Sequence, residues 1–534
     1  MNKKLLYLFL VLIFLKIIIS LFIQFPLGYL DSLIYQETAK TFFETLSISN
    51  MAEFKYPYLY PLMISPAFLF EDMEKVFLII KIINSILSSL IIFPVYLLSK
   101  EFFSKKKSFY IATICGFIPP LFIFTFTSMS ENLFYPLFLF AIFMIYKAFK
   151  ENSWEWNIFT GIIVGLAILT KILAVVLIPT IIFMSLFRLK HYPKRIILLL
   201  FTIIISSTLF IPRILNSGFD LGKILGYQAS IDNASSSLFL ITKIIWVFLY
   251  LDYLILASGI ILFFYAILLI LKYRKLEHDE KLFIQIIFFT TLFLIIICAN
   301  HSGSHEKYTD YRTIGRYIEG TIPLFLILGF LQIQKKEIRT NTSLVLLSIF
   351  TIITTYFILF DKFFPINNSS LTHIGLIKYF LDSFQMNSKI ILVFGVIILL
   401  IVGSLLIKKI KEKQIYKFIL IYFFLITMIN ISIIFYDTQE RWLTSEGAEI
   451  GRWINEKLDP NSKILFDQEE LIKQPLHQIE INKNEKPIQI AAYWIRGTWK
   501  IGDISSDSDY IITKKDLDKE ILYIGSSGTK VYKA

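Results

Sequence analysis

The sequence has very few cysteines and no convincing internal repeat. Only Cys115 and Cys298 occur in 534 residues, and both fall inside apolar runs, which argues against a disulfide framework. No low-complexity linker is longer than the Asn and Ser cluster at 367–370. Because many transporters consist of two similar halves, the lack of a repeat weighs against that class.

Apolar residues are abundant. Hydrophobic residues make up 56% of the chain, 52 residues are Phe, and the mean hydropathy is +0.65, which indicates a polytopic α-helical membrane protein. Runs of about 17 to 25 apolar residues, the length that crosses a bilayer as a helix, predict about thirteen transmembrane helices. The runs begin near residues 5, 75, 108, 132, 157, 172, 194, 246, 282, 317, 342, 389 and 415. The first run lacks a small-residue cleavage site, so we expect it to be a mature helix rather than a signal peptide.

Basic residues predict the orientation. With a cytoplasmic N-terminus, the six loops that would also be cytoplasmic are all basic, and the intervening loops are poorer in Lys and Arg. The net charge of +12 is therefore interpreted as an orientation signal in a multi-pass protein of the cell membrane, and not as nucleic-acid binding.

The composition changes after about residue 437. Residues 1–436 are predicted to form the transmembrane domain, and residues 437–534 a small extracytoplasmic α/β domain. A helix is expected in "SEGAEIGRWINEKL" after a cap at Ser445, and strands in "KILFD", "PIQIAAYWI", "DYIIT" and the hairpin "EILYIGSSGTKVYKA". The domain has no nucleophile or metal-ligand set in its sequence, so we assign it no catalysis.

Polar residues near the predicted outer helix ends are functional candidates, since the bilayer disfavours them. They come from segments that are far apart in the sequence: Asp31, Lys55, Glu131, Lys171, Arg312 and Arg316. Acids and cations on one face suggest the handling of an anionic headgroup together with a proton acceptor.

Several motifs resemble the GT-C class of membrane glycosyltransferases. They are "GYLDSLIYQETAKTF" (28–42), "FKYPYLYPLMISPAFLF" (54–70), "SMSENLFYPLFLF" (128–140), "GLAILTKILAVVLIP" (165–179) and "GRYIEGTIPLFLIL" (315–328). Their order is similar to that in the dolichyl-phosphate-mannose protein mannosyltransferase and aminoarabinose transferase branch. There, an Asp opens a membrane-parallel helix, which would place such helices at about 31–66 here. The sequence departs from this branch at Ile172 and Leu173, where Gly-Pro is common, and at "KYPYLYP", where the aminoarabinose enzymes have Lys-Pro-Pro.

The resemblance implies transfer of a sugar from a polyprenyl-phosphate donor to a hydroxyl of a protein, lipid or glycan, with inversion. Such a reaction needs a base and positive charge for the leaving phosphate. Asp31 is the candidate base and Glu131 the second catalytic acid. Lys55, Lys171 and Arg316 are candidates for the donor phosphate, Arg316 with the fork geometry that suits two oxygens. Asp31 and Glu131 are also the candidate ligands of a divalent metal, Mg or Mn with carboxylates and water, or Zn with a His partner.

Tyrosines form a second group of candidates, for contacts with the sugar or the lipid: Tyr35, Tyr56, Tyr58, Tyr60 and Tyr317. Tyrosine is also common at membrane interfaces without any ligand. The pair His301 and His305 has metal-ligand spacing, but "HSGSHEKY" is expected to be a loop. Asn367 matches a glycosylation acceptor pattern that has many false positives.

Simpler explanations exist for the charged candidates. Asp31 could be a helix cap, Glu131 a solvated residue before a helix, Lys55 and Lys171 could extend to the membrane interface, and Arg316 could be an interface anchor. Two other classes of protein also remain open: a transporter or flippase of a lipid-linked sugar, and a non-catalytic membrane scaffold.

Overall fold

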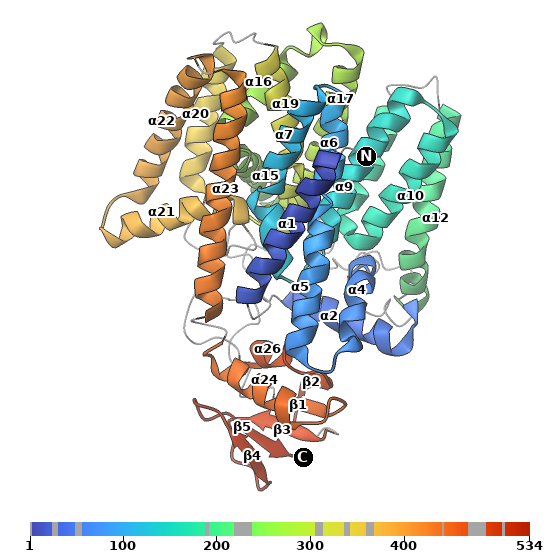
Figure 1. The fold of residues 1–534 in the computed structure, drawn as a ribbon, viewed down its shortest axis with the longest axis vertical. Coiled ribbons are helices and arrows are strands. Elements are labelled where there is room, and N and C mark those ends of the chain that lie inside the picture. Colours follow the sequence, from blue (N-terminus) through green and yellow to red (C-terminus); the bar gives the residue numbers. More distant parts are fainter. Residues whose placement is uncertain are drawn as a thin grey trace.

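The structure is a computed structural model, and it describes residues 3–23, 30–48, 56–186, 192–217, 238–304, 313–335, 342–358, 368–409, 411–439, 443–467, 487–504 and 508–534. A helical bundle fills one end of the molecule, and a small sheet with two helices lies at the other end (Figure 1). The helices up to residue 186 are α1 (Lys3–Phe22), α2 (Leu30–Thr45), α4 (Leu59–Ile64), η1 (Ser65–Leu69), α5 (Met73–Ser89), α6 (Ile92–Lys100), α7 (Lys105–Gly116), α8 (Pro119–Ile123), η2 (Phe124–Phe126), α9 (Glu131–Glu151), α10 (Trp154–Thr170), η3 (Ile172–Val176) and α11 (Leu177–Leu186). Those that complete the bundle are α12 (Tyr192–Ser217), α15 (Leu238–Ala257), α16 (Ile261–Leu271), η6 (Tyr273–Lys275), α17 (His278–Ser304), η7 (Gly315–Tyr317), η8 (Glu319–Thr321), α19 (Ile322–Gln334), α20 (Thr342–Phe357), η9 (Ser369–Leu371), α21 (Thr372–Ser383), α22 (Ser388–Lys409) and α23 (Glu412–Asp437).

Each predicted apolar run corresponds to a helix or to a bent pair of helices. Among the described residues, six helices are long and apolar enough to cross a membrane, or eight if each bent pair is one span. They are Lys3–Phe22, Met73–Lys100, Glu131–Glu151, Lys194–Leu215, His278–Gly303 and Glu412–Tyr436. The helical membrane class is thus supported, and the count of thirteen spans stays a prediction.

Two of the predicted runs are bent. The run near residue 108 forms Lys105–Gly116 and Pro119–Phe126, with 68° between them, and the run near 246 forms Thr242–Ala257 and Ile261–Leu271, with 114° between them. Pro119 and Pro120 explain the first bend, because proline lacks the N–H that would continue the helix. The runs that abut at Thr170 are separate helices.

The chain after residue 443 forms α24 (Glu446–Lys457), α26 (Pro487–Ala492) and five strands. The strands are β1 (Lys463–Asp467), β2 (Thr498–Gly502), β3 (Tyr510–Thr513), β4 (Ile521–Ile524) and β5 (Lys530–Lys533). Their order in the sheet is β2-β1-β3-β5-β4, with β1 parallel to both neighbours and β5 antiparallel to both of its own. Ile464 and Phe466 pack with residues of the two helices, whereas Leu465 packs on the opposite face with Ile511 and Tyr532, as the alternation of a strand requires.

Most of the expected elements in this part are confirmed. Ser445 caps α24 by accepting a hydrogen bond from the Ala448 N–H, and the strands in "KILFD" and "DYIIT" and the C-terminal hairpin are present. The strand expected at 487–495 is wrong, because Pro487 opens a helix there. Short apolar runs do not distinguish strand from helix, and proline is favoured at the first helical position. The strand β2 was not predicted.

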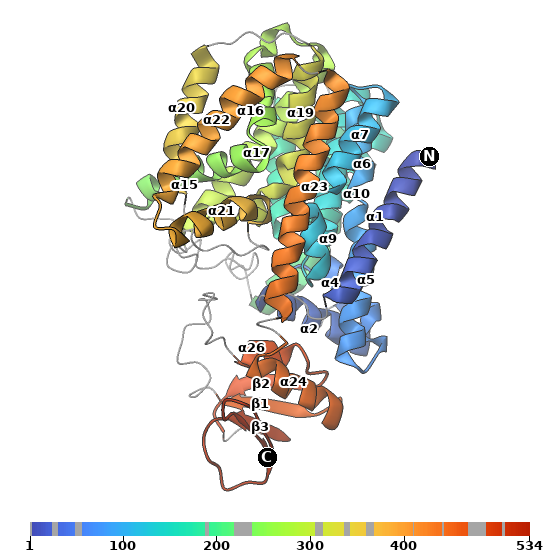
Figure 2. The same ribbon diagram turned by 60° about the vertical axis from the view of Figure 1, so that its left-hand side comes forward.

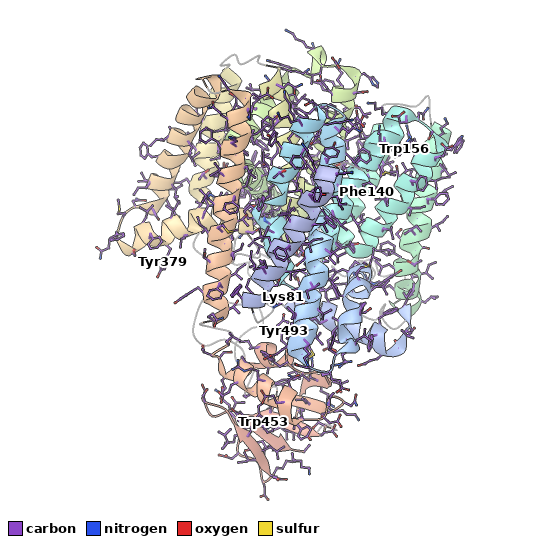
Figure 3. The ribbon with its side chains drawn as sticks, viewed as in Figure 1. Lys81, Phe140, Trp156, Tyr379, Trp453 and Tyr493 are labelled. Carbon is purple, nitrogen blue, oxygen red and sulfur yellow. The ribbon has the colours of Figure 1, made fainter. Side chains whose placement is uncertain are left out.

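Side chains join the sheet end to the bundle through α2 and α5. Tyr493, which Figure 3 places at this junction, packs edge-on against Phe77 of α5 at 6.1 Å. Lys40 of α2 donates to the Gly497 carbonyl at 2.6 Å, and the Trp499 indole donates to Glu37 at 3.1 Å. The helix α2, whose first turn contains Asp31, therefore also contacts the C-terminal part, and Figure 2 shows α2 between the bundle and the sheet.

Candidate active site

Asp31 and Arg316 form an ion pair although 285 residues separate them. Asp31 lies in the first turn of α2, and its Oδ2 accepts from Arg316 Nη2 at 2.7 Å. Its Oδ1 accepts from the Tyr56 hydroxyl at 2.7 Å. Side-chain donors therefore hold this carboxylate, and the backbone donors expected for a helix cap are not among its described partners. Its side chain keeps 24% of its exposure, against 10% for Arg316.

Glu131 and Lys171 form a second, more deeply buried pair. Glu131 opens α9, and Lys171 has an extended backbone where α10 stops and η3 begins. Lys171 Nζ lies 2.5 Å from Glu131 Oε1, and the two side chains are 9% and 0% exposed. The interpretation of Glu131 as a solvated residue is therefore wrong, and so is that of Lys171 as a cation extended to the interface.

Aromatic rings and the hydroxyl groups of Tyr35 and Ser130 lie between the two pairs. Lys171 Nζ and Arg316 Cζ lie 5.1 Å and 5.4 Å from the centroid of the same Tyr317 ring, within the range of cation–π contacts. The Tyr35 hydroxyl is bonded to Ser130 Oγ at 2.9 Å, and Ser130 donates to Glu131 at 3.4 Å. Four candidates named from the sequence, Asp31, Glu131, Lys171 and Arg316, thus form one cluster, which we call the four-charge cluster.

The four-charge cluster balances two carboxylates with two cations. Burial raises the pKa of Asp31, but the Arg316 charge and the hydrogen bonds from Tyr56 and Arg316 outweigh it, so the net pKa lies below the usual range of an aspartate. Asp31 is therefore ionised at neutral pH. It is also the more exposed of the two acids, which makes it the one that a second molecule can reach.

Among the described residues, the carboxylates that the four-charge cluster could offer to a divalent metal are Asp31 and Glu131. Each carboxylate already faces a cation, and the described residues contain no group of three or more His, Cys, Asp or Glu that could hold a metal ion. A divalent ion at Asp31 and Glu131 would have to displace Arg316 and Lys171 or share oxygens with them.

The structure separates the remaining candidates. The Tyr35 ring packs at a tilt against Tyr56, with 5.2 Å between the centroids, and edge-on against Tyr60 at 5.4 Å. The Tyr60 hydroxyl donates to Asn84 at 3.1 Å. Tyr58 is bonded to Thr208 of α12 at 2.5 Å. Tyr56 and Tyr317 thus contact residues of the four-charge cluster, and Tyr35 is joined to it through Ser130 and Tyr56. The Tyr58 and Tyr60 hydroxyls have their partners elsewhere.

The loop predicted for "HSGSHEKY" is wrong at its start, at His301. His301 lies in the last turn of α17 and not in a loop, with its ring 5.5 Å from Tyr317. A stretch rich in Ser and Gly can continue a helix for one turn when the preceding residues are strongly helical. Lys55, His305, Arg312 and Asn367 lie outside the described residues.

Sequence reasoning missed several polar groups around the cluster. The Tyr135 hydroxyl donates to the Arg316 carbonyl at 2.8 Å, and Asn368 accepts from the Gly315 N–H at 2.9 Å. Tyr135 could have been found, since it lies four residues after Glu131 and therefore on the same helix face. Asn368 gives no comparable signal.

Comparisons with known proteins bear on the family and the fold. Residues 56–215 match the family described as dolichyl-phosphate-mannose-protein mannosyltransferase. ArnT from Cupriavidus metallidurans bound to undecaprenyl phosphate is similar with a TM-score of 0.59 and 12% identity, over 100% of this chain and 98% of that chain. Apo ArnT gives 0.58 and 12% over 99% and 98%. The apo oligosaccharyltransferase of Archaeoglobus fulgidus gives 0.40 and 13% over 86% and 62%. No curated protein sequence matches the chain. The resemblance predicted from the sequence motifs is thus confirmed, and the fold is that of ArnT.

Proposed function

We propose that this protein, which has the GT-C fold of ArnT, transfers a sugar from a polyprenyl-phosphate carrier to an acceptor hydroxyl with inversion at the anomeric carbon. The observation that carries the proposal is the four-charge cluster, in which the partly exposed Asp31 carboxylate pairs with Arg316 and the buried Glu131–Lys171 pair lies next to it. The lipid carrier is supported by a structure of the same fold that was determined with undecaprenyl phosphate bound.

In the proposed reaction the acceptor oxygen attacks the anomeric carbon on the face opposite the phosphate. The bond between that carbon and the phosphate oxygen breaks, and its electron pair leaves with the phosphate. The acceptor proton moves to the Asp31 carboxylate. No general acid is required, because a phosphate leaving group already carries its negative charge well.

The cations have separate partners, and this suggests separate roles. Arg316 presents one arm of its fork to Asp31, while Nη1 lies 4.0 Å from Met129 Sδ. A phosphate that replaces Asp31 as the partner of Arg316 would also raise the basicity of the released carboxylate. Lys171, held by Glu131, supplies the second positive charge. Stabilising charge that develops on a leaving group is commonly the largest contribution to such catalysis.

We further propose the topology expected from the basic loops. Residues 1–436 would form about thirteen spans, with the N-terminus in the cytoplasm and the cluster near the outer surface. Residues 437–534 would then lie outside, against α2, on the side from which a protein, lipid or glycan acceptor approaches.

The direct test is transfer of radiolabelled sugar from polyprenyl-phosphate donors to candidate acceptors by the purified protein in liposomes. Asp31→Asn should lower the transfer rate by about two to four orders of magnitude, the range for a positioned general base. Asp279→Asn is the matched control, because Asp279 also lies in the first turn of a helix and pairs with a lysine, Lys150, at 2.7 Å. This control should keep its activity within about twofold.

Two outcomes would contradict the proposal. Transfer by Asp31→Asn at the wild-type rate would remove Asp31 from the mechanism. Movement of the lipid-linked sugar across the liposome membrane without any transfer to an acceptor would favour the transporter class instead.

A further inference from the structure

The backbone of residues 314–316 is held by side chains from three separate elements. The Ile314 N–H donates to the Tyr250 hydroxyl of α15 at 3.1 Å, and the Gly315 N–H donates to Asn368 Oδ1 at 2.9 Å. The Arg316 carbonyl accepts from the Tyr135 hydroxyl of α9 at 2.8 Å. Backbone groups are mostly satisfied by other backbone groups, so side-chain contacts at three successive residues distinguish this turn.

The turn is also closely packed. A Cβ at Gly315 would lie 2.0 Å from ring carbon Cζ and from the hydroxyl oxygen of Tyr253, so only glycine fits there. The Tyr253 hydroxyl donates to Glu319 at 2.7 Å, and Glu319 also accepts from the Ser370 N–H at 3.0 Å. These contacts join η7, η8 and η9 through Tyr253 and Glu319, close to the backbone of Arg316.

An arginine side chain has about 2 kcal/mol of rotamer entropy, and its fork is effective only where its base is fixed. A displacement of about 1 Å in a positioning group can cost about two orders of magnitude in rate. The hydrogen bonds to the turn at residues 314–316 hold the Cα of Arg316 in place. Asp31 and Tyr317 contact its guanidinium. We propose that Tyr135, Tyr250 and Asn368 are positioning residues, which hold the Arg316 backbone so that its guanidinium meets the donor phosphate. This inference rests on the proposed function.

Tyr135→Phe tests the inference most sharply, because it removes only the hydroxyl that contacts Arg316. We expect the kcat/KM for the polyprenyl-phosphate sugar to fall about tenfold, the usual effect of one buried hydrogen bond. The loss should appear as a higher KM for the donor, with the KM for the acceptor unchanged. Tyr146→Phe on the same helix is the matched control, since the Tyr146 hydroxyl contacts Lys150 at 3.4 Å instead. It should stay within about twofold of the wild type.

A double-mutant cycle separates positioning from general support of the fold. In an Arg316→Gln background the guanidinium is gone, so Tyr135→Phe should cost less than about twofold. A further tenfold loss in that background would show that Tyr135 acts independently of Arg316 and would overturn the inference. So would a Tyr135→Phe enzyme with the same donor KM as the Tyr146→Phe control.

Failure of the inference can be distinguished from failure of the proposed function. A wild-type protein that transfers no sugar from any donor contradicts the function itself, whereas an active wild type with an unaffected Tyr135→Phe variant contradicts only the positioning role. If Tyr135→Phe does not yield folded protein, Tyr250→Phe removes the acceptor of the Ile314 N–H and enters the same cycle, with the same outcomes deciding.

Discussion

Lysines are buried in two different ways in the helical part of this protein. Lys171 faces the carboxylate of Glu131 at 2.5 Å, beside a second ion pair. Lys16 of α1 and Lys81 of α5 are also buried, but they donate to hydroxyl and carbonyl oxygens. Within the described ranges no carboxylate lies at ion-pair distance from either. The same residue type is thus charge-paired in one region and solvated by neutral oxygens in the other.

Lys16 and Lys81, the two lysines bonded to uncharged oxygens, connect helices. Lys16 donates to Ser88 Oγ at 2.7 Å and to a main-chain carbonyl of α8 at 3.2 Å. Lys81, labelled in Figure 3, donates to the carbonyls of Ser20 and Ile23 at the end of α1, where a helix has unsatisfied acceptors. Both side chains therefore fasten α1 to its neighbours.

The difference indicates how a functional cation can be recognised in an apolar interior. A lysine bonded to helix-end carbonyls has no anionic partner that a phosphate could replace. We therefore expect such a lysine to contribute only to stability. A lysine or arginine bonded to a carboxylate can change partners when a phosphate arrives, because one anion replaces another. We therefore expect substitutions in the two regions to affect different quantities.

Among the lysines in this comparison, the largest effect is expected at Lys171. Lys171→Met removes a charge proposed to stabilise the leaving phosphate, so transfer should fall by about two to three orders of magnitude. It also leaves the buried Glu131 carboxylate without its partner, which typically costs about 3–5 kcal/mol of stability. Transfer assays and thermal unfolding of the purified variant measure the two effects.

Adding Glu131→Gln to this variant separates the two effects. The double variant has no unpaired charge, so its stability should recover most of the loss while transfer stays low. Recovery of transfer together with stability would mean that Lys171 acts only in folding, and the comparison with Lys16 and Lys81 would then fail.

A smaller effect is expected in the pH dependence of Arg316→Gln. Burial raises the pKa of Asp31, and Arg316 is the strongest of the groups that lower it. Without the guanidinium the pKa of Asp31 should rise. A base works only when ionised, so the acid limb of kcat/KM should move to higher pH in the variant. Tyr56→Phe removes a weaker contribution of the same sign and should shift the limb less.

An acid limb at the wild-type pH in both variants would contradict Asp31 as the base. A limb that moved to lower pH would contradict the assignment of its neighbours, since both of them stabilise the ionised form. The full pH profile with one donor at saturating acceptor concentration decides between these outcomes.

The sequence located the long apolar helices, and its candidates included the members of the four-charge cluster. Apolar length predicted where those helices lie. Charges near predicted helix ends, together with the family resemblance, singled out Asp31, Glu131, Lys171 and Arg316 along with Lys55 and Arg312. The pairing was not predictable, because Asp31 meets Arg316 only after most of the chain has folded around them. Lys16 and Lys81 were not singled out at all, since apolar runs tolerate an isolated lysine without any sign of its partner.

The elements that were missed depend on tertiary context as well. Whether "PIQIAA" forms a strand or a helix is decided by what packs on it, and here Ala491 and Ile495 complete the face of the sheet. Asn368 is one of two adjacent asparagines in a short polar stretch, and only its contact with the Gly315 N–H distinguishes it. Local sequence patterns do not predict such tertiary contacts.

The smallest expected effect on activity is at Lys81, and it tests the neutral half of the comparison. Lys81→Met keeps the length of the side chain but removes the hydrogen bonds to the end of α1. Charge-assisted hydrogen bonds contribute about 1.5–3 kcal/mol each, while removal of a buried charge relieves a desolvation cost of similar size. We therefore expect a net loss of stability below about 2 kcal/mol, seen as a lower Tm, and transfer within about threefold of the wild type.

Lys75→Met on the same helix is the control, since Lys75 is 66% exposed and its loss should leave the Tm unchanged. If Lys81→Met instead lost transfer as strongly as Lys171→Met at an unchanged Tm, Lys81 would have a role in the reaction, because a lysine that only fastens α1 affects turnover through the fold alone.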